Sequence, residues 1–332
     1  MSSSPSVVIV SPALADANNG NWRTAWRWQE LLAGHVPVRI TKEWPDAAAS
    51  ADTLMLALHA RRSAAPIAAW AERHPGHGLA VVLTGTDLYR DIATDAAAQR
   101  SLDLAQRLVV LQERGPDALP PQHRGKARVI YQSAPAVPPL DKSAASLQAV
   151  MVGHLRDVKS PQTLFAAARL LRGRSDIRIT HIGDGADEPA LAEQARATAG
   201  DCPGYRWLGP VPHEETLQQI RCAHVLVHTS ALEGGAHVIL EAVRCGTPVL
   251  ASRVPGNVGM LGAHYEGYFP HGDAAVLAAL LVDCREGQRM ENPRDHLLER
   301  LRAQCAQRAP LFDAGTERRA LLNLLQELDT AP

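Results

Sequence analysis

The segment SALEGGAHVILEA, residues 230–242, follows a short apolar run and leads into a helical pattern, as in the strand–loop–helix unit of an α/β fold. Its glycines allow close backbone approach to a ligand, and the free N–H groups of a first helical turn favour an anion such as phosphate. If the helix begins near Gly235, Glu233 lies in the preceding loop and Glu241 about two turns into the helix. The two carboxylates could then contact different parts of one elongated ligand, and each suits a vicinal diol. Two surface glutamates at an ordinary helix start are the alternative explanation.

Short apolar runs and amphipathic helical patterns alternate on both sides of this segment, which predicts an α/β fold with parallel sheets and crossover helices. In the first half of the chain we expect strands at residues 7–10, 36–40, 53–58, 79–83, 108–111 and 128–131, and helices at 21–33, 63–72 and 96–105. In the second half we expect strands at residues 149–152, 177–182, 205–208, 225–227 and 248–251, and helices at 162–171, 214–221, 238–245, 274–282 and 310–328.

A proline-rich stretch at residues 132–139 predicts a linker between two Rossmann-like domains. We place the first domain at residues 1–138 and the second at 146–308, and we expect residues 309–332 to form a helix that packs back towards the first domain. Two such domains would enclose a cleft, and ligands of open parallel sheets lie at the carboxyl ends of the strands.

The bulk composition excludes several classes of protein. The net charge of −1 provides no global field that would attract nucleic acid or an anionic membrane. The five cysteines form no Cys-x-x-Cys pair, which argues against a disulfide framework or a zinc site. The first residues carry no charged region and no long apolar stretch, so we expect neither export nor a membrane span. The expectation is a cytoplasmic protein without metal or other cofactor and without nucleic-acid or membrane partners.

Three further strand–loop–helix junctions accompany residues 230–242. They are VGHLRDVKSP at 152–161, HIGDG at 181–185 and WLGPVP at 207–212. Arg156 and Lys159 in the first junction could neutralise a diphosphate, although exposed loop charge is the simpler explanation for each alone. The G-x-G-x-x-G fingerprint of dinucleotide-binding folds is absent from both halves.

Taken in order, these motifs resemble the second domain of the GT-B glycosyltransferases of the GT4 family. The matching residues are Val152-Gly153 with Lys159, Gly183-Asp184-Gly185, Leu208-Gly209-Pro210-Val211, Glu233 with Glu241, and Glu241-Ala242 with Gly246-Thr247-Pro248-Val249. The resemblance covers residues 152–256 and implies a nucleotide-sugar donor held without a metal ion.

The resemblance also implies individual roles. Lys159 and a neighbouring cation would hold the diphosphate, Glu241 the ribose and Glu233 the transferred sugar. The remaining donor-binding residues would be Gly20, Asn21, Gly153, Gly183, Val211, Gly235, Ala236, His237 and Val238. The family's usual arginine after the first glycine is His154 in this sequence, so we assign the missing cation to Arg156.

Three loops of the first half would form the acceptor side. NNGNWRT at residues 18–24 resembles the loop that closes over donor phosphates in these enzymes, or is simply an Asn-Gly turn. The other two are LHARRS at 58–63 and LTGTDLYR at 83–90. Together they supply cations and hydroxyl groups that suit an anionic acceptor, namely Arg23, Arg61, Thr84, Thr86 and Arg90, and the carboxylate of Asp87 completes the predicted acceptor-binding set. An alcohol acceptor would instead need a general base, for which His59 or Asp87 is available, although a lone strand-end histidine is more often structural.

The first-half motifs further resemble the selenosugar synthases of bacterial selenoneine biosynthesis. This resemblance implies transfer from a UDP-sugar, UDP-N-acetylglucosamine in particular, to selenophosphate, with formation of a carbon–selenium bond. The catalytic candidates are His59, Arg156, Lys159 and Glu233. A GT4-type enzyme with an alcohol acceptor and a UDP-sugar epimerase of the same fold are the alternatives.

Overall fold

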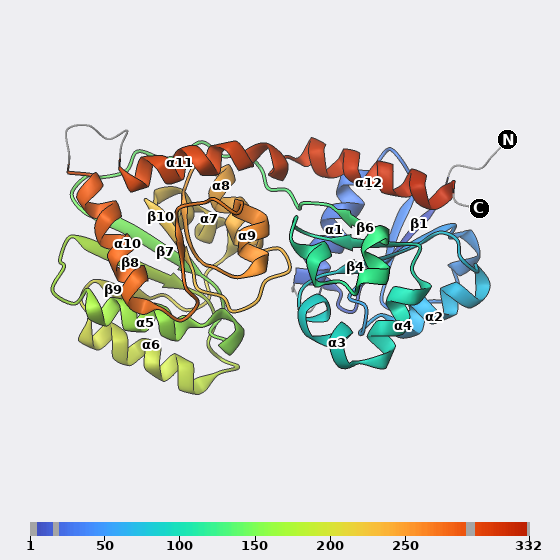
Figure 1. Cartoon of the computed structure of the whole chain (residues 1–332), viewed down its shortest axis with the longest axis horizontal. Coiled ribbons are helices and arrows are strands. Elements are labelled where there is room, and N and C mark those ends of the chain that lie inside the picture. The colour runs from blue at the N-terminus through green and yellow to red at the C-terminus, as the bar shows by residue number, and fades with distance from the viewer. Residues whose placement is uncertain (1–4, 16–19, 290–295, 331–332) are drawn as a thin grey trace. The chain divides into compact units, whose positions relative to one another are not determined.

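The computed structural model describes residues 5–15, 20–289 and 296–330, and the chain forms two compact units. The first unit comprises Met1–Ser133 with Asp313–Pro332, and the second comprises Ala134–Phe312. Each unit contains one six-stranded sheet whose paired strands are all parallel (Figure 1). The predicted α/β architecture with two parallel sheets is therefore confirmed.

The first sheet has the strand order β2-β1-β3-β4-β5-β6, so the order reverses between β1 and β3. Its strands are β1 (Val7–Val10), β2 (Val38–Thr41), β3 (Leu54–Leu58), β4 (Leu79–Leu83), β5 (Arg107–Val110) and β6 (Ala127–Val129). Every residue of β1, β3 and β4 is buried, because helices cover both faces of the sheet.

Two apolar clusters line the two faces of this sheet. Its helices are α1 (Gly20–Leu32), α2 (Ala64–Arg73), α3 (Ile92–Thr94), α4 (Ala96–Leu104) and α12 (Ala314–Asp329). Val8 and Met55 pack with Trp70 of α2 and with residues of α4, whereas Val7 and Leu54 pack with α1 and α12. The alternation follows the two-residue period of a strand. The C-terminal helix α12 thus completes the core of the first unit.

The second sheet has the order β12-β11-β10-β7-β8-β9, with the reversal between β10 and β7. Its strands are β7 (Leu147–Val152), β8 (Ile177–Ile182), β9 (Tyr205–Trp207), β10 (Val225–His228), β11 (Val249–Ser252) and β12 (Tyr268–Phe269). Its helices are α5 (Pro161–Leu170), α6 (Pro189–Asp201), α7 (His213–Cys222), α8 (His237–Arg244), α9 (Pro255–Leu261), α10 (Ala274–Gly287) and α11 (Leu297–Arg308). Helix α10 contacts β7, β8 and α5, while α7 contacts β7 and α8.

Some elements differ from the sequence prediction. The helix predicted at residues 310–328 is a short 3-10 turn at Ala309–Phe312 followed by α12, because the Asp313 side chain accepts from the Gly315 N–H at 2.9 Å and starts a new helix. Helices α6, α9 and α11 were not predicted. The α9 sequence PGNVGML contains residues of low helix propensity, so the sequence pattern did not predict a helix there.

Among the described residues, no helix is both long and apolar enough to cross a membrane.

Candidate functional site

The candidate site of the second unit lies at the reversal of its sheet, where the loops after β7 and β10 meet. At this reversal the connections that follow the two parallel strands run to opposite sides, which leaves a crevice at the carboxyl ends of the strands. Two hydrogen bonds hold these loops together: Thr229 Oγ1 donates to the Lys159 carbonyl at 2.6 Å, and the Ala231 N–H donates to the Val158 carbonyl at 2.8 Å. These two bonds therefore fix the backbone at Lys159 against the loop that begins at residue 230.

Lys159, His228 and Glu233 form a cluster in this crevice, in which His228 and Glu233 are buried and Lys159 is half-buried. Lys159 Nζ lies 2.6 Å and His228 Nε2 lies 3.1 Å from Glu233 Oε1. Burial raises the pKa of Glu233, but Lys159 and His228 outweigh burial and hold that pKa well below its usual range. The carboxylate is thus ionised at neutral pH.

Both partners of Glu233 bind the same oxygen. Within the part of the chain that the structure describes, no hydrogen bond engages Oε2, and about 10% of the Glu233 side chain is exposed. The cluster therefore orients one carboxylate oxygen by protein contacts and leaves the other available to accept hydrogen bonds from a ligand. The sequence prediction missed His228, whose only signal was its place at the carboxyl end of a predicted strand.

Glycines bring the surrounding loops into close contact. A Cβ atom at Gly183, whose φ is 154°, would lie 1.9 Å from the Gly153 carbonyl oxygen. A Cβ atom at Gly256 would lie 1.9 Å from the Glu233 carbonyl oxygen. Neither position accommodates a side chain without displacing a loop that carries candidate residues.

Helix α8 starts at His237, one residue before the predicted helix of residues 238–245 and two residues after the start supposed near Gly235, and the side chain of its N-cap residue Ala236 makes no capping hydrogen bond. Its first turn, which includes the N–H groups of His237 and Val238, carries the positive end of the helix dipole, which favours an anion. Glu241 lies in the second turn and is buried, with His213 Nε2 at 2.6 Å and His237 Nε2 at 3.5 Å from its Oε1. His213 was not predicted as a site residue.

His154 and Arg156 occupy different environments after β7. His154 Nδ1 accepts from the Asp184 N–H at 3.1 Å, and burial, with the nearby Arg156 charge, lowers its pKa. A neutral histidine results at pH 7. Arg156 is exposed and lies 3.7 Å from Asp187, so it retains the positive charge that His154 lacks. The remaining predicted residues Gly183 and Val211 lie in the loops after β8 and β9.

In the first unit, His59 follows β3 at the reversal of the sheet and has the left-handed φ of 72°, a strained conformation of the kind that is concentrated at functional sites. Its side chain is buried, with Nε2 3.3 Å from Thr86 Oγ1, and burial lowers its pKa despite the nearby Asp87 and Asp91. The imidazole is therefore neutral at pH 7.

Asp87 fixes the loops of the first unit. It is fully buried and accepts from the N–H groups of Ala60, Thr84 and Gly85 at 3.0, 2.9 and 2.9 Å. Three backbone donors leave this carboxylate little capacity to take a proton from a substrate, so the geometry favours a structural role over that of a general base.

The predicted acceptor cations Arg61 and Arg90 converge on one carboxylate. Asp91 accepts from Arg61 Nε at 2.9 Å and from Arg90 Nε at 3.3 Å. Gly20, Asn21 and Arg23 lie in the first turn of α1, and the predicted loop residues 18 and 19 lie outside the described residues.

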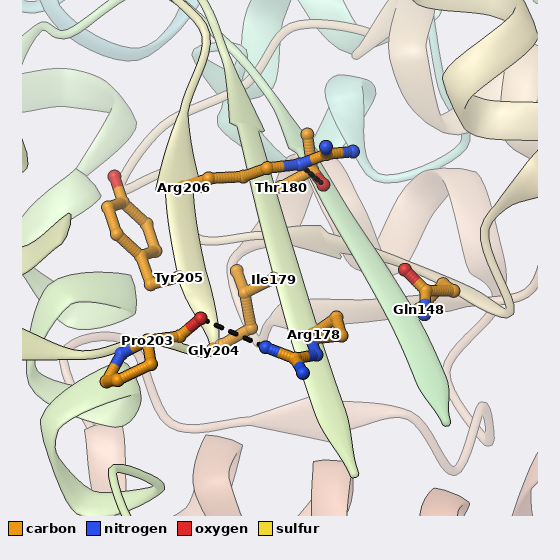
Figure 2. A pocket seen from close by; sticks show the side chains of 8 residues that line it. All are labelled: Gln148, Arg178, Ile179, Thr180, Pro203, Gly204, Tyr205 and Arg206. Carbon is orange, nitrogen blue, oxygen red and sulfur yellow. Dashed lines mark hydrogen bonds between the residues drawn. The ribbon is translucent and has the colours of Figure 1, made fainter. Parts of the chain in front are cut away.

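Two hollows were not predicted. Figure 2 shows the first, of about 280 Å³, on β7, β8 and β9; Arg178 donates to the Pro203 carbonyl at 3.1 Å and Arg206 to Thr180 Oγ1 at 2.8 Å. Gln148 and Arg178 are the second residues of their strands, so this hollow lies away from the carboxyl ends. The second hollow, of about 570 Å³, lies at the strand ends of the first unit.

Among the described residues, no three His, Cys, Asp or Glu side chains gather as metal ligands would.

Comparison with protein families and curated sequences gives a consistent result. Residues 138–295 match the family model described as Glycosyl transferases group 1. A D-inositol 3-phosphate glycosyltransferase of Thermobispora bispora is 28% identical over 221 residues, which are 61% of this chain and 51% of the relative. The same enzyme of Geodermatophilus obscurus is 35% identical over 147 residues, 40% of this chain and 33% of the relative. The chain thus spans about half or less of the length of these relatives.

Solved structures resemble the chain over nearly its whole length. Anabaena Alr3699/HepE, in complex with UDP-glucose, has a TM-score of 0.72 at 17% identity, covering 97% of this chain and 100% of that chain. Sucrose-phosphate synthase from Thermosynechococcus elongatus has a TM-score of 0.72 at 17% identity, and the match covers 98% of this chain and 99% of that chain. At this identity the similarity establishes the fold, and the predicted GT-B type of architecture is confirmed.

Proposed function

We propose that this chain, whose residues 138–295 match the family model of the glycosyl transferases group 1, transfers a sugar from a UDP-sugar to a small anionic acceptor. The observation that carries the proposal is the cluster of Lys159 with the buried Glu233 and His228, at the loop that leads into α8, where the strand order of the second sheet reverses. This crevice offers a cation and the positive end of a helix to a diphosphate, and carboxylate oxygens to sugar hydroxyls. The UDP-glucose complex of the similar Alr3699/HepE supports a nucleotide-sugar donor.

In this proposal the second unit binds the donor and the first unit the acceptor. Lys159, Arg156 and the amides at the start of α8 stabilise the negative charge that develops on UDP as its bond to the anomeric carbon breaks. Glu233 Oε2 accepts from the transferred sugar, and Glu241 accepts from the ribose hydroxyls. The role of the protein is to hold the donor and to favour departure of UDP with the bonding electrons.

The finer proposal is UDP-N-acetylglucosamine as donor and selenophosphate as acceptor. Selenium would form the new bond to the anomeric carbon as the bond to UDP breaks, and loss of the phosphoryl group to water would give the selenosugar. This proposal rests on the resemblance of the first-half loops, and a nucleophile that is already anionic agrees with the lack of a free general base at Asp87.

The test is incubation of the full chain with UDP-N-acetylglucosamine and selenophosphate, with UDP release and the selenium-containing product measured by mass spectrometry. We expect UDP and product in equal amounts, and little UDP without acceptor. Release of UDP only with an alcohol would contradict the finer proposal alone. Isomerisation of the donor without acceptor would indicate an epimerase, and no conversion of any UDP-sugar would contradict both proposals.

Glu241→Gln is expected to weaken UDP binding about tenfold, because a charge-assisted hydrogen bond to the ribose becomes a neutral one. Calorimetric titration with UDP measures the effect. Glu214→Gln, at an exposed position in the first turn of α7, is the matched control and should bind UDP as the parent does. Equal affinities of all three proteins would remove Glu241 from the nucleotide site.

His59→Asn tests for a general base, because asparagine tolerates the left-handed conformation of this residue. With an anionic acceptor we expect the rate of transfer to change less than about threefold, whereas loss of a required base costs about 10² to 10⁴-fold. Steady-state rates with selenophosphate, and with any alcohol that proves to be a substrate, measure both cases. A loss of 10²-fold or more with selenophosphate would make His59 a catalytic base.

A further inference from the structure

A pocket of about 570 Å³ opens at the carboxyl ends of β1, β2 and β3. Lys42 and Glu43 follow β2, Pro12 follows β1, and Arg62 follows β3, so the pocket lies where open parallel sheets bind ligands. Trp44 forms part of the wall. None of these residues belongs to the acceptor set predicted from the sequence.

The two cations of this pocket differ from those predicted to bind the acceptor. Arg61 and Arg90 are both bound to Asp91, and these neighbours lower the pKa of that carboxyl group although burial raises it. Lys42 and Arg62 are exposed, and the described residues give neither side chain an ion-pair or hydrogen-bond partner. Among the described residues that line the pocket, Glu43 is the one acidic side chain, so these lining residues together carry a net positive charge.

The pocket wall is held rigidly. Trp44 Nε1 donates to Asp52 Oδ2 at 2.9 Å, and its ring lies 4.9 Å from that of Trp70. On the other side, the Arg62 N–H points to His59 Nδ1 at 3.4 Å, which ties Arg62 to the strained end of β3. These contacts fix Trp44 and the backbone of Arg62, so the wall of the pocket is in place before an anion binds.

We infer that Lys42 and Arg62, and not Arg61 and Arg90, bind the anionic group of the acceptor. The inference rests on the proposed function for its acceptor and adds the residues that recognise it. The ligand chemistry is a tetrahedral, phosphate-like anion. The volume exceeds what a free phosphate-sized ion fills, so the pocket also accepts the phosphate of a sugar or polyol phosphate.

Calorimetric titration of the full chain with inorganic thiophosphate, and separately with glucose 6-phosphate, tests the site without requiring turnover. We expect Lys42→Ala and Arg62→Ala each to weaken binding of the anions about tenfold, as the loss of one charge-assisted contact predicts. Arg61→Ala should change the affinity less than about threefold, because Asp91 already holds that side chain. Arg100→Ala, at an exposed position on α4, is the matched control.

Two outcomes would overturn the inference. The first is that the parent chain shows no saturable binding of either anion. The second is that Arg61→Ala lowers the affinity for the anions tenfold while Lys42→Ala and Arg62→Ala keep the affinity of the parent. Donor-side function is measured in the same variants by UDP titration. If Lys42→Ala and Arg62→Ala bind both UDP and the anions as the parent does, only this anion site is contradicted. If the parent chain itself does not bind UDP, the proposed function is contradicted.

Discussion

Lys159→Met is expected to reduce the rate of sugar transfer by about 10² to 10³-fold, the cost of removing one group that stabilises charge developing in the transition state. The ammonium group lies 2.6 Å from Glu233 and is held by the fixed loop after β7. Methionine keeps the side chain up to the ε position but lacks the ammonium group and its charge. Steady-state kinetics with a UDP-sugar donor measure the loss, which should lie mainly in kcat.

The same substitution should change the pH dependence of activity. The pKa of Glu233 lies below the value of an unfolded glutamate, about 4.3, so its ion pair stabilises the fold above that pH and loses this effect as the pH falls towards the folded-state pKa. Without Lys159, burial is opposed only by His228, and the pKa of Glu233 rises. The acidic limb of the activity profile should therefore move to higher pH in the variant.

Arg172→Met, an exposed cation of the second unit beyond α5, is the control and should retain full activity. Thermal unfolding of both variants separates loss of chemistry from loss of fold. Activity of Lys159→Met within about threefold of the parent, with the fold intact, would contradict a role for this cation in catalysis, since the expected loss is at least thirty times larger.

The strands were predicted well because their burial is uniform. All four residues of Val7–Val10 and all five of Leu79–Leu83 are buried, so each reads as a continuous apolar run with clear ends. Helix α9 could not be predicted in this way. Its two glycines and its asparagine serve close packing, such as that of Gly256 on the Glu233 carbonyl, and oppose helix formation in isolation.

The site was predictable where the chemistry lies within one segment. Glu233 and the glycines after it are local, and Lys159 follows a recognisable junction. The third member of the cluster, His228, lies only five residues before Glu233, but it was missed because a contact between two side chains cannot be read from the sequence. For the same reason Arg61 and Arg90 looked like free cations, although Asp91 binds both of them.

Glu317→Ala is expected to lower the free energy of unfolding by about 3 to 5 kcal/mol, as for other buried charges whose partners are left unpaired. Glu317, on the first turn of α12, is 1% exposed. Its carboxylate accepts from Trp28 Nε1 at 2.7 Å and from the N–H and Oγ of Ser133 at 2.7 and 2.6 Å, with Arg27 Nε at 3.3 Å. Alanine would leave buried donors on Trp28 and Ser133 without a partner.

Glu327→Ala on the same helix is the matched control, because its carboxylate also pairs with two arginines, Arg107 at 2.6 Å and Arg128 at 2.7 Å. About a third of that side chain is exposed to solvent, so the loss should stay below about 1 kcal/mol. Urea unfolding of both variants compares them directly. Burial, not the number of charged partners, is what distinguishes the two glutamates, so equal losses in the two variants would contradict this explanation.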